Sequence, residues 1–144
     1  MQTEMLAPAA ALVLWSMIVQ LWMTITRFSG FKDKGIELSK VPPGGRGSGL
    51  DGVLPDKTMW KSHNFTHLME QPTIFYPVVI ILAQVGGGIW DLRLAWAYVA
   101  LRIIHSVYQS TVNIIKNRAM LFFAMSACLL LLAIHAVILT LFAA

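Results

Sequence analysis

Long uncharged segments alternate with short polar segments along this chain. Residues 5–26, 71–90 and 119–144 contain no Asp, Glu, Lys or Arg, and residues 94–115 contain only Arg102. An α-helix needs about 20 apolar residues to cross a bilayer, so each segment is long enough to span. The pattern predicts an all-α fold, a single four-helix membrane bundle over residues 1–144, with spans near 5–27, 60–86, 92–115 and 118–143.

The second predicted span carries two helix-breaking residues. Pro72 and Pro77 lie inside it, and each removes a backbone N–H donor and can kink the helix. The span ends at the three glycines 86–88, which predict a short turn. Asp91 and Arg93 follow, and we expect them to form a solvated pair at the membrane surface.

Polar side chains form stripes on the second and third predicted spans. His63, His67 and Glu70 are spaced i, i+4 and i+7, so they share one helical face. A second stripe follows one broad face of the third span, at Tyr98, Arg102, His105, Gln109, Asn113 and Lys116. Because polar faces of membrane helices look toward protein or water, we expect the two stripes to converge inside the assembly.

Composition and charge agree with a membrane protein and set its orientation. The chain is 57% hydrophobic and 12% charged, with a mean hydropathy of +0.67. Seven of the 11 basic residues lie within 27–61, and two more lie in the expected tight turn 116–118. The positive-inside rule therefore places the basic loop 28–59 and this turn in the cytoplasm. The net charge of +4 is explained by this topology and indicates no nucleic-acid partner.

Two interpretations compete for the charged residues of the stripes. Arg102 can form a buried ion pair with Glu70 and lock two helices together, within one chain or between neighbours. Alternatively, Arg118 provides an anion site, because an arginine is permanently charged and offers forked donors to a carboxylate or a thiolate. Arg118 also has a simpler interpretation as a basic residue that snorkels from the end of a helix.

A metal site is the weaker alternative for the histidines. The spacing of His63, His67 and Glu70, with His105 as a fourth ligand, is compatible with zinc, but any two histidines four residues apart satisfy it. We expect no metal. His135, within the fourth span, is expected to form a hydrogen bond between helices. The single cysteine, Cys128, excludes a disulfide within the chain.

From roughly Trp60 to its end, the chain resembles the MAPEG family, the membrane-associated proteins in eicosanoid and glutathione metabolism. The resemblance is strongest in NFTHLMEQPTIFYP and AWAYVALRIIHSVYQSTVNIIKNR. In the second span the family has Arg, three residues, Asn, two residues and Glu, followed by proline and aromatic residues. Glu70 and the stretch after it fit, whereas His63 and His67 stand where the arginine and the asparagine belong.

Later residues of the chain extend this resemblance. Arg102 and His105 keep the family's Arg-x-x-His pair, and Gln109 stands where catalytic relatives often have tyrosine. Arg118 matches the arginine that activates the glutathione thiol in catalytic members. Arg27 falls near a family arginine that reaches the glutathione of a neighbouring subunit, although the first 60 residues match only in pattern.

The resemblance implies a homotrimer, surrounded by membrane lipids, in a bacterial inner membrane. It implies that glutathione binds between subunits near the cytoplasmic face and that lipophilic substrates enter from the bilayer. On this basis a glutathione-dependent transferase or peroxidase is expected, and the alternative is a non-catalytic trimer that binds lipid or a membrane partner. The expected site comprises Arg118 as the catalytic residue and, for glutathione binding, Arg27, His67, Glu70, Arg102, His105 and Gln109.

Overall fold

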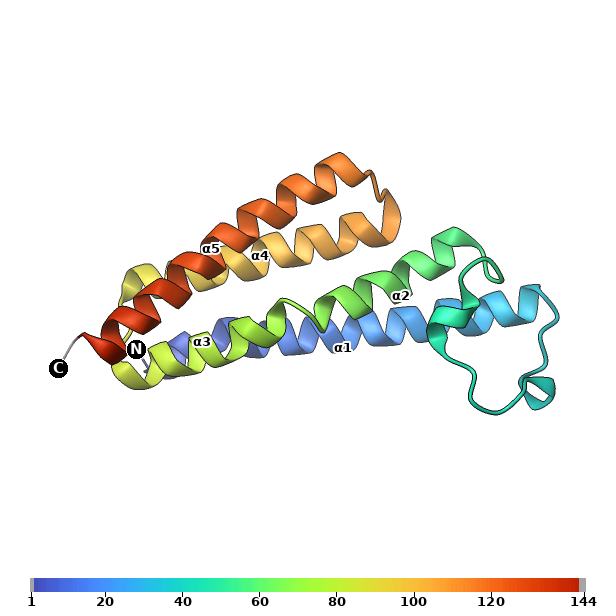
Figure 1. Ribbon diagram of the computed structural model, residues 1–144, viewed down its shortest axis with the longest axis horizontal. Helices are drawn as coiled ribbons and strands as arrows, with labels where there is room; N and C mark the ends of the chain where they lie inside the picture. Colours follow the sequence, from blue (N-terminus) through green and yellow to red (C-terminus); the bar gives the residue numbers. More distant parts are fainter. Residues whose placement is uncertain (1, 143–144) are drawn as a thin grey trace.

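The computed structural model describes residues 2–142, and these residues form four long helical stretches. The first is α1 (Gln2–Asp33), and the second is divided into α2 (Asp56–Leu68) and α3 (Pro72–Val85). The remaining two are α4 (Ile89–Thr111) and α5 (Ile115–Leu141). Short 3-10 turns, η1 (Leu38–Lys40) and η2 (Gly47–Leu50), lie in the loop after α1. Figure 1 shows α1 beginning and α5 ending at one end of the bundle, with the loop and the α4–α5 turn at the other.

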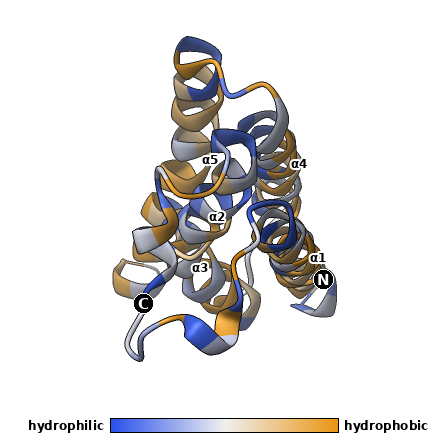
Figure 2. Ribbon diagram, turned by 90° about the vertical axis from the view of Figure 1, so that its right-hand side faces the viewer, coloured by the Kyte–Doolittle hydropathy of each residue, from blue (hydrophilic) through white to orange (hydrophobic). Residues whose placement is uncertain are grey.

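Three of the four stretches are long and apolar enough to cross a membrane by themselves. They are Gln2–Asp33, Asp56–Val85 and Ile115–Leu141. The stretch α4 does not reach this level, because Arg102, His105 and Gln109 lower its mean hydropathy. It packs along α5 and also contacts α1 and α2. Hydrophobic residues nevertheless extend along α1 and α4 in Figure 2. The helices thus form an integral membrane bundle in which α4 carries the polar face.

The core lies where the apolar faces of the four stretches meet. Phe75 of α3 stacks on Tyr98 of α4 with ring centroids 4.4 Å apart, and neither side chain is exposed. Other core side chains come from α1, α3 and α5, namely Leu12, Val19, Val79, Leu82, Met125 and Leu132. Bilayer lipid is as apolar as these side chains, so close packing and interhelical hydrogen bonds are what favour the assembled bundle.

The second stretch breaks at a proline, as the sequence predicts. The α-helix α2 ends at Leu68, residues 69–71 form a turn, and Pro72 is the first residue of α3. Proline lacks the backbone N–H that would continue the helix, and its ring clashes with the carbonyl four residues earlier. Pro77, in contrast, lies within α3. The break matters because it leaves carbonyl groups at the end of α2 available to other donors.

The connection between α4 and α5 differs from the predicted turn. It comprises residues 112–114, and Lys116, Asn117 and Arg118 lie in the first helical turn of α5. Asn113 has a φ of 57°, and asparagine is one of the few residues that adopt this left-handed conformation at low cost. The expectation of a turn at 116–118 is therefore wrong, because the chain reverses at Asn113 and α5 begins earlier.

The expected solvated pair of Asp91 and Arg93 is also not found. Asp91 is 3% exposed. Its carboxylate accepts hydrogen bonds from the Gly88 N–H at 2.7 Å and from His135 Nδ1 of α5 at 2.6 Å. Arg93 instead lies over the ring of Trp90, 4.8 Å from its centroid. The hydrogen bond between helices that was predicted for His135 is present, and its partner is Asp91.

Candidate functional site

A cavity of about 260 Å³ lies between α2, α4 and α5, near the α4–α5 turn. Figure 1 shows the α4–α5 hairpin diverging from α2 toward this turn. We call it the interhelical cavity; it is lined by His67, His105, Gln109, Ile115, Arg118, Ala119, Phe122 and Phe123. Four residues proposed from the sequence (His67, His105, Gln109 and Arg118) therefore meet in one cavity, although they lie on three helices.

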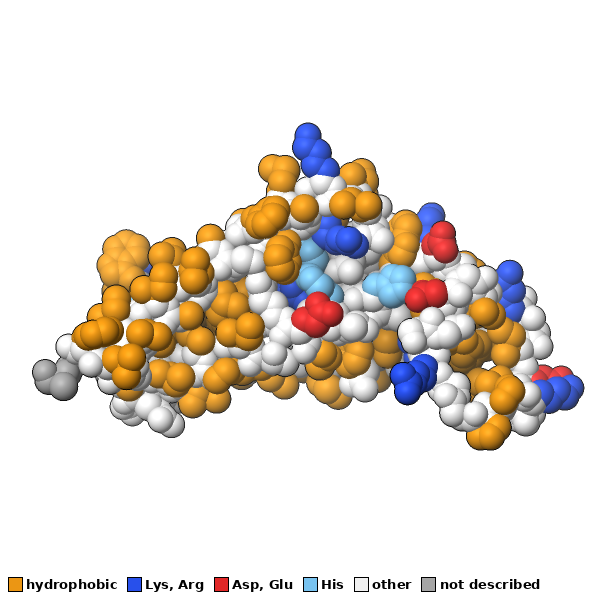
Figure 3. Space-filling view, in the orientation of Figure 1, with side chains coloured by type: hydrophobic (Ala, Val, Ile, Leu, Met, Phe, Trp, Pro, Cys, Tyr) orange, Lys and Arg blue, Asp and Glu red, His pale blue; other side chains and the backbone are white. Residues whose placement is uncertain are grey.

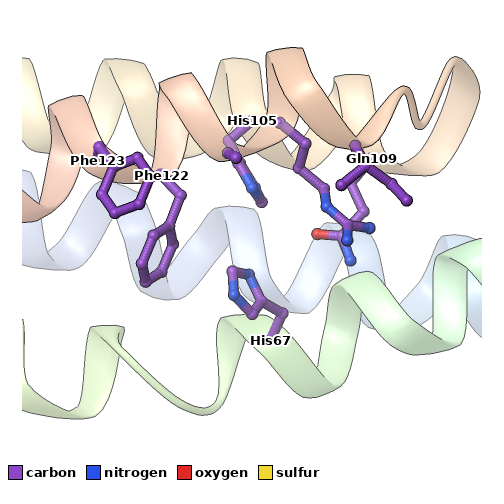
Figure 4. A pocket seen from close by; sticks show the side chains of 8 residues that line it. His67, His105, Gln109, Phe122 and Phe123 are labelled. Atoms are coloured by element: carbon purple, nitrogen blue, oxygen red, sulfur yellow. The ribbon is translucent and has the colours of Figure 1, made fainter.

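Two histidines face one another across the interhelical cavity. The rings of His67 on α2 and His105 on α4 are stacked, with centroids 5.2 Å apart and planes at 27° (Figure 4). Three buried atoms here have no hydrogen-bond partner among the described residues: Nδ1 of His67, Nδ1 of His105 and Oε1 of Gln109. Buried polar atoms are nearly always paired in native proteins, so these three are suited to bind a ligand or water.

Arg118 supplies the positive charge of the interhelical cavity. Its Nη1 donates to the side-chain oxygen of Asn113 at 2.7 Å, and the side chain is half-buried. Among the described residues, Arg118 forms no ion pair. The Asn113 side chain, which lies in the turn, thus orients a guanidinium whose remaining donors are available to an anion.

A second cavity, of about 300 Å³, adjoins the first and contains Glu70. Both cavities are lined by His67 and Gln109, so the two are neighbours. The side chain of Glu70 is 62% exposed, and one of its oxygens lies 3.9 Å from His67 Nε2. Acidic, basic and histidine side chains accordingly gather near the middle of one face of the molecule (Figure 3). We call this second cavity the Glu70 cavity.

The histidines are not arranged as a metal site. His63 Nε2 lies 2.9 Å from Asp51 of the loop, and His63 lines the Glu70 cavity but not the interhelical cavity. Within residues 2–142, no group of three or more His, Cys, Asp or Glu side chains is placed to hold a metal ion. Although His63, His67 and Glu70 share one helical face, their side chains are not close enough together to coordinate one metal ion.

Arg102 lies beneath the interhelical cavity and does not pair with Glu70 within the chain. Its side chain is fully buried. One Nη donates to the backbone carbonyl of His67, and the other contacts Met125 Sδ at 3.7 Å. The physical reason is the helix break: the His67 carbonyl at the end of α2 accepts a long hydrogen bond of 3.4 Å from the Glu70 N–H and can also accept from Arg102, while the Glu70 side chain is 62% exposed. Arg102 consequently holds the backbone that carries His67.

Arg27 is separate from the interhelical cavity. Its Nη2 donates to Ser62 Oγ of α2 at 2.6 Å, and its guanidinium packs against Gly47, where a Cβ atom would lie 3.2 Å from Nη2. Ser62 and Gly47 both line the Glu70 cavity. The structure thus places Arg27 at the edge of that cavity, where it ties the loop after α1 to α2.

The sequence reasoning missed a buried polar network behind the cavities. Nδ2 of Asn64 on α2 donates to Ser106 Oγ at 2.7 Å and to Ser110 Oγ at 2.9 Å on α4, and Trp15 of α1 donates to Ser106 at 3.0 Å. The two serines are spaced i, i+4, which was an available signal for one helical face. A similar network joins the turn between α2 and α3 to α4 and α5 through Gln71, Tyr98 and Ser126.

The fold and the cavity together define the class of protein: an integral membrane bundle of four helical stretches, with a cluster of polar and charged residues near the middle of one face. The sequence profile of the MAPEG family matches residues 5–138, so the chain belongs to the MAPEG family. The match includes α1, for which the sequence motifs offered only a general pattern. No curated protein and no solved structure shows a significant match to the chain.

Proposed function

We propose that this protein binds glutathione in the interhelical and Glu70 cavities and is a glutathione-dependent transferase or peroxidase for lipophilic substrates. The observation that carries the proposal is the interhelical cavity itself. It brings together a cation, Arg118, and three buried polar atoms without partners, on His67, His105 and Gln109. Such a concave site with a few converging polar groups is typical of small-molecule binding.

The charges of the two cavities are complementary to glutathione. This tripeptide has two carboxylates, one ammonium group and one thiol. Arg118 in one cavity suits an anionic group, and Glu70 in the adjoining cavity suits the ammonium group. His67 and Gln109, which line both cavities, provide hydrogen-bonding groups between the two charges. The positive charge in one cavity and the negative charge in the next therefore support binding of an extended zwitterionic ligand across both cavities.

The proposed chemistry depends on a positive charge next to the thiol. Bound glutathione supplies a thiolate nucleophile. In this chain, Arg118 favours the ionised form of the thiol, and Asn113 holds the Arg118 guanidinium in place. Phe122 and Phe123 form an apolar wall beside the arginine, which excludes water and suits a lipophilic electrophile.

The proposed assembly is a homotrimer in a bacterial inner membrane, with the loop after α1 in the cytoplasm. Glu70 supports the assembly, because a carboxylate that is 62% exposed within a membrane-spanning stretch requires a partner. A neighbouring subunit or an ammonium group of the ligand can provide one. The basic residues of the loop support the orientation by the positive-inside rule.

The test of this proposal is the thiolate signal of bound glutathione. We expect ultraviolet absorbance of a thiolate when the wild-type protein binds glutathione at neutral pH. Arg118→Ala should abolish this absorbance and lower turnover of a generic electrophile about a hundredfold, as losing one electrostatic stabiliser does. Arg118→Lys should recover only part of both, because lysine lacks the planar fork.

The matched control is Lys116→Ala. Lys116 lies in the same first turn of α5 but is exposed and does not line the interhelical cavity. Its removal should leave the absorbance and the turnover unchanged. If Lys116→Ala and Arg118→Ala had equal effects, or if Arg118→Lys behaved as wild type, Arg118 would act only as an interfacial anchor.

The second candidate function is a non-catalytic trimer that binds lipid or a membrane partner. The observation that favours it is the composition of the interhelical cavity, where Gln109 stands at the position of a tyrosine in catalytic relatives and Ile115, Phe122 and Phe123 form an apolar wall. Wild-type protein that neither binds glutathione nor conjugates an electrophile, but retains lipid after purification, would favour this function over the first.

A further inference from the structure

Another cavity lies under the loop that follows α1 and shares no lining residue with the interhelical cavity. Its volume is about 350 Å³. The end of α1 forms one side of it and residues 36–50 of the loop form the other, so we call it the loop cavity. The apolar part of its wall comprises Phe28, Phe31, Ile36, Leu38, Val41 and Leu50.

The apolar residues of the loop cavity are unusual for their position. The segment 34–55 is rich in glycine, proline and charged residues and connects two helices at the end of the bundle. Even so, Leu38 is 52% exposed and Val41 is 45% exposed, and Phe28 at the end of α1 is 56% exposed. Adjacent exposed apolar side chains in a polar segment indicate a binding surface.

Two arginines complete the wall of the loop cavity. Arg27 and Arg46 both line it, and neither arginine forms an ion pair with another described residue. Nε of Arg27 is buried and has no hydrogen-bond partner within residues 2–142. Gly47 allows the Arg27 guanidinium to lie directly against the loop backbone, because any Cβ atom there would crowd it. Arginine cannot lose its charge in a protein, so this cavity combines an apolar wall with two permanent positive charges.

We propose that the loop cavity binds a long-chain fatty acid, with its carboxylate held by Arg46 and Arg27 and its hydrocarbon chain against the apolar wall. The planar fork of arginine matches the geometry of a carboxylate. The volume is at the small end of the range of about 300–1,000 Å³ for small-molecule sites, which suits one chain better than a phospholipid with two. This binding site goes beyond the proposed use of glutathione. The loop cavity shares Gly47 with the Glu70 cavity, and Arg27, which the family resemblance assigns to glutathione, here serves a second anion.

Photolabelling tests the proposal directly. The full chain is placed in nanodiscs of phosphatidylcholine without glutathione and exposed to a palmitic acid that carries a diazirine on its chain. After illumination, mass spectrometry of peptides should find the label within residues 28–50. Palmitate should compete with the label, whereas methyl palmitate, which has the same chain without the charge, should not.

Two matched variants separate a specific carboxylate site from a general attraction to a basic loop. Arg46→Gln should weaken competition by palmitate about tenfold or more, the scale expected for losing a hydrogen bond to a charged group. Lys34→Gln removes one positive charge from the same loop at an exposed residue that does not line the cavity. It should leave competition unchanged. Both side chains are exposed, so neither change should prevent folding.

Several results would overturn the proposal. One is an equal loss of palmitate competition in Arg46→Gln and Lys34→Gln. Another is competition by methyl palmitate that is as strong as competition by palmitate. Competition by phosphatidylglycerol without competition by palmitate would assign the cavity to a phospholipid headgroup instead. Absence of label from residues 28–50 would show that the loop cavity takes up no fatty acid. Arg118→Ala should retain the label, so a failure of glutathione binding is distinguishable from a failure of this site.

Discussion

Arg102 is fully buried, and a backbone carbonyl, rather than a carboxylate, is its main partner. A buried charge is costly unless hydrogen bonds satisfy it. The carbonyl of His67 meets part of this need because α2 ends one residue later, at Leu68, whereas Nε of Arg102 has no hydrogen-bond partner among the described residues. The same contact fixes the backbone under His67, whose ring lines the interhelical cavity. In this structure Arg102 therefore supports the backbone that carries His67, and its part in binding glutathione stays a prediction.

At the residue scale, we predict that Asp91 is important for stability at the opposite end of the bundle. Asp91→Ala leaves both the Gly88 N–H and His135 Nδ1 without their acceptor. A hydrogen bond to a charged group contributes about 1.5–3 kcal/mol, and water can replace part of this at the His135 side chain, which is 42% exposed. Unfolding in mixed micelles should therefore occur at lower denaturant concentration.

The control for Asp91 is its neighbour Arg93. Arg93→Ala removes an exposed charge that only covers Trp90, and it should change stability little. His135→Ala should have an effect between the two, because Asp91 then keeps its bond to Gly88. Equal stability of Asp91→Ala and Arg93→Ala would contradict the role assigned to the buried carboxylate.

At the scale of elements, the α4–α5 turn sets the position of Arg118. Thr111 ends α4, Ile115 begins α5, and the three residues between them reverse the chain. Asn113 serves this turn in two ways: its backbone adopts φ 57°, and its side-chain oxygen accepts from Arg118. The shape of the turn and the orientation of the proposed catalytic arginine are therefore coupled through one residue.

We predict that two substitutions of Asn113 have different effects on stability. Asn113→Ala requires alanine in the left-handed region, which costs about 1–2 kcal/mol. Asn113→Gly accommodates this backbone without steric strain and should be distinctly more stable than the alanine variant. Both variants lose the acceptor for Arg118, so the difference between their thermal unfolding midpoints measures the backbone alone. Identical midpoints would show that the turn does not require a positive φ.

At the scale of the whole molecule, one chain leaves polar surface exposed within a membrane-spanning stretch. Glu70 faces outward on the second stretch, and a single bundle of four stretches provides it with only the distant contact to His67. Exposed carboxylates are unfavourable in hydrocarbon, so an assembly that covers Glu70 gains stability. The expected ion pair with Arg102 does not form within the chain, so Glu70 is accessible to a partner from outside the chain.

We predict that the protein is a homotrimer in lipid and that Glu70 contributes to its stability. Native mass spectrometry from nanodiscs, without glutathione, should detect trimers of the wild type and a larger fraction of dissociated chains for Glu70→Gln. Glu37→Gln, which alters an exposed loop carboxylate paired with Lys40, should behave as wild type. A wild-type monomer in lipid, or an unchanged Glu70→Gln trimer with unchanged ligand binding, would contradict this prediction.

The fold was predictable from the sequence because the bilayer imposes a simple requirement on length and hydropathy. Four helical stretches, the proline break before Pro72 and the hydrogen bond of His135 to another helix agree with the structure. The convergence of His67, His105, Gln109 and Arg118 was also predictable, because the ends of antiparallel helices meet and the polar faces turn inward.

Partner choice, in contrast, was decided by the tertiary structure. Helical periodicity shows which side chains share a face, but the distance between helices and the exact end of each helix determine which atoms meet. The end of α2 at Leu68 gives Arg102 a carbonyl in place of Glu70. The turn at Asn113 places Arg118 within α5, and the packing of α4 on α5 buries Asp91 against His135. The sequence by itself determined the membrane bundle and the meeting of its polar faces. Only the packed helices decided which groups form hydrogen bonds with one another, because hydrogen bonds depend on ångström-scale geometry that periodicity does not contain.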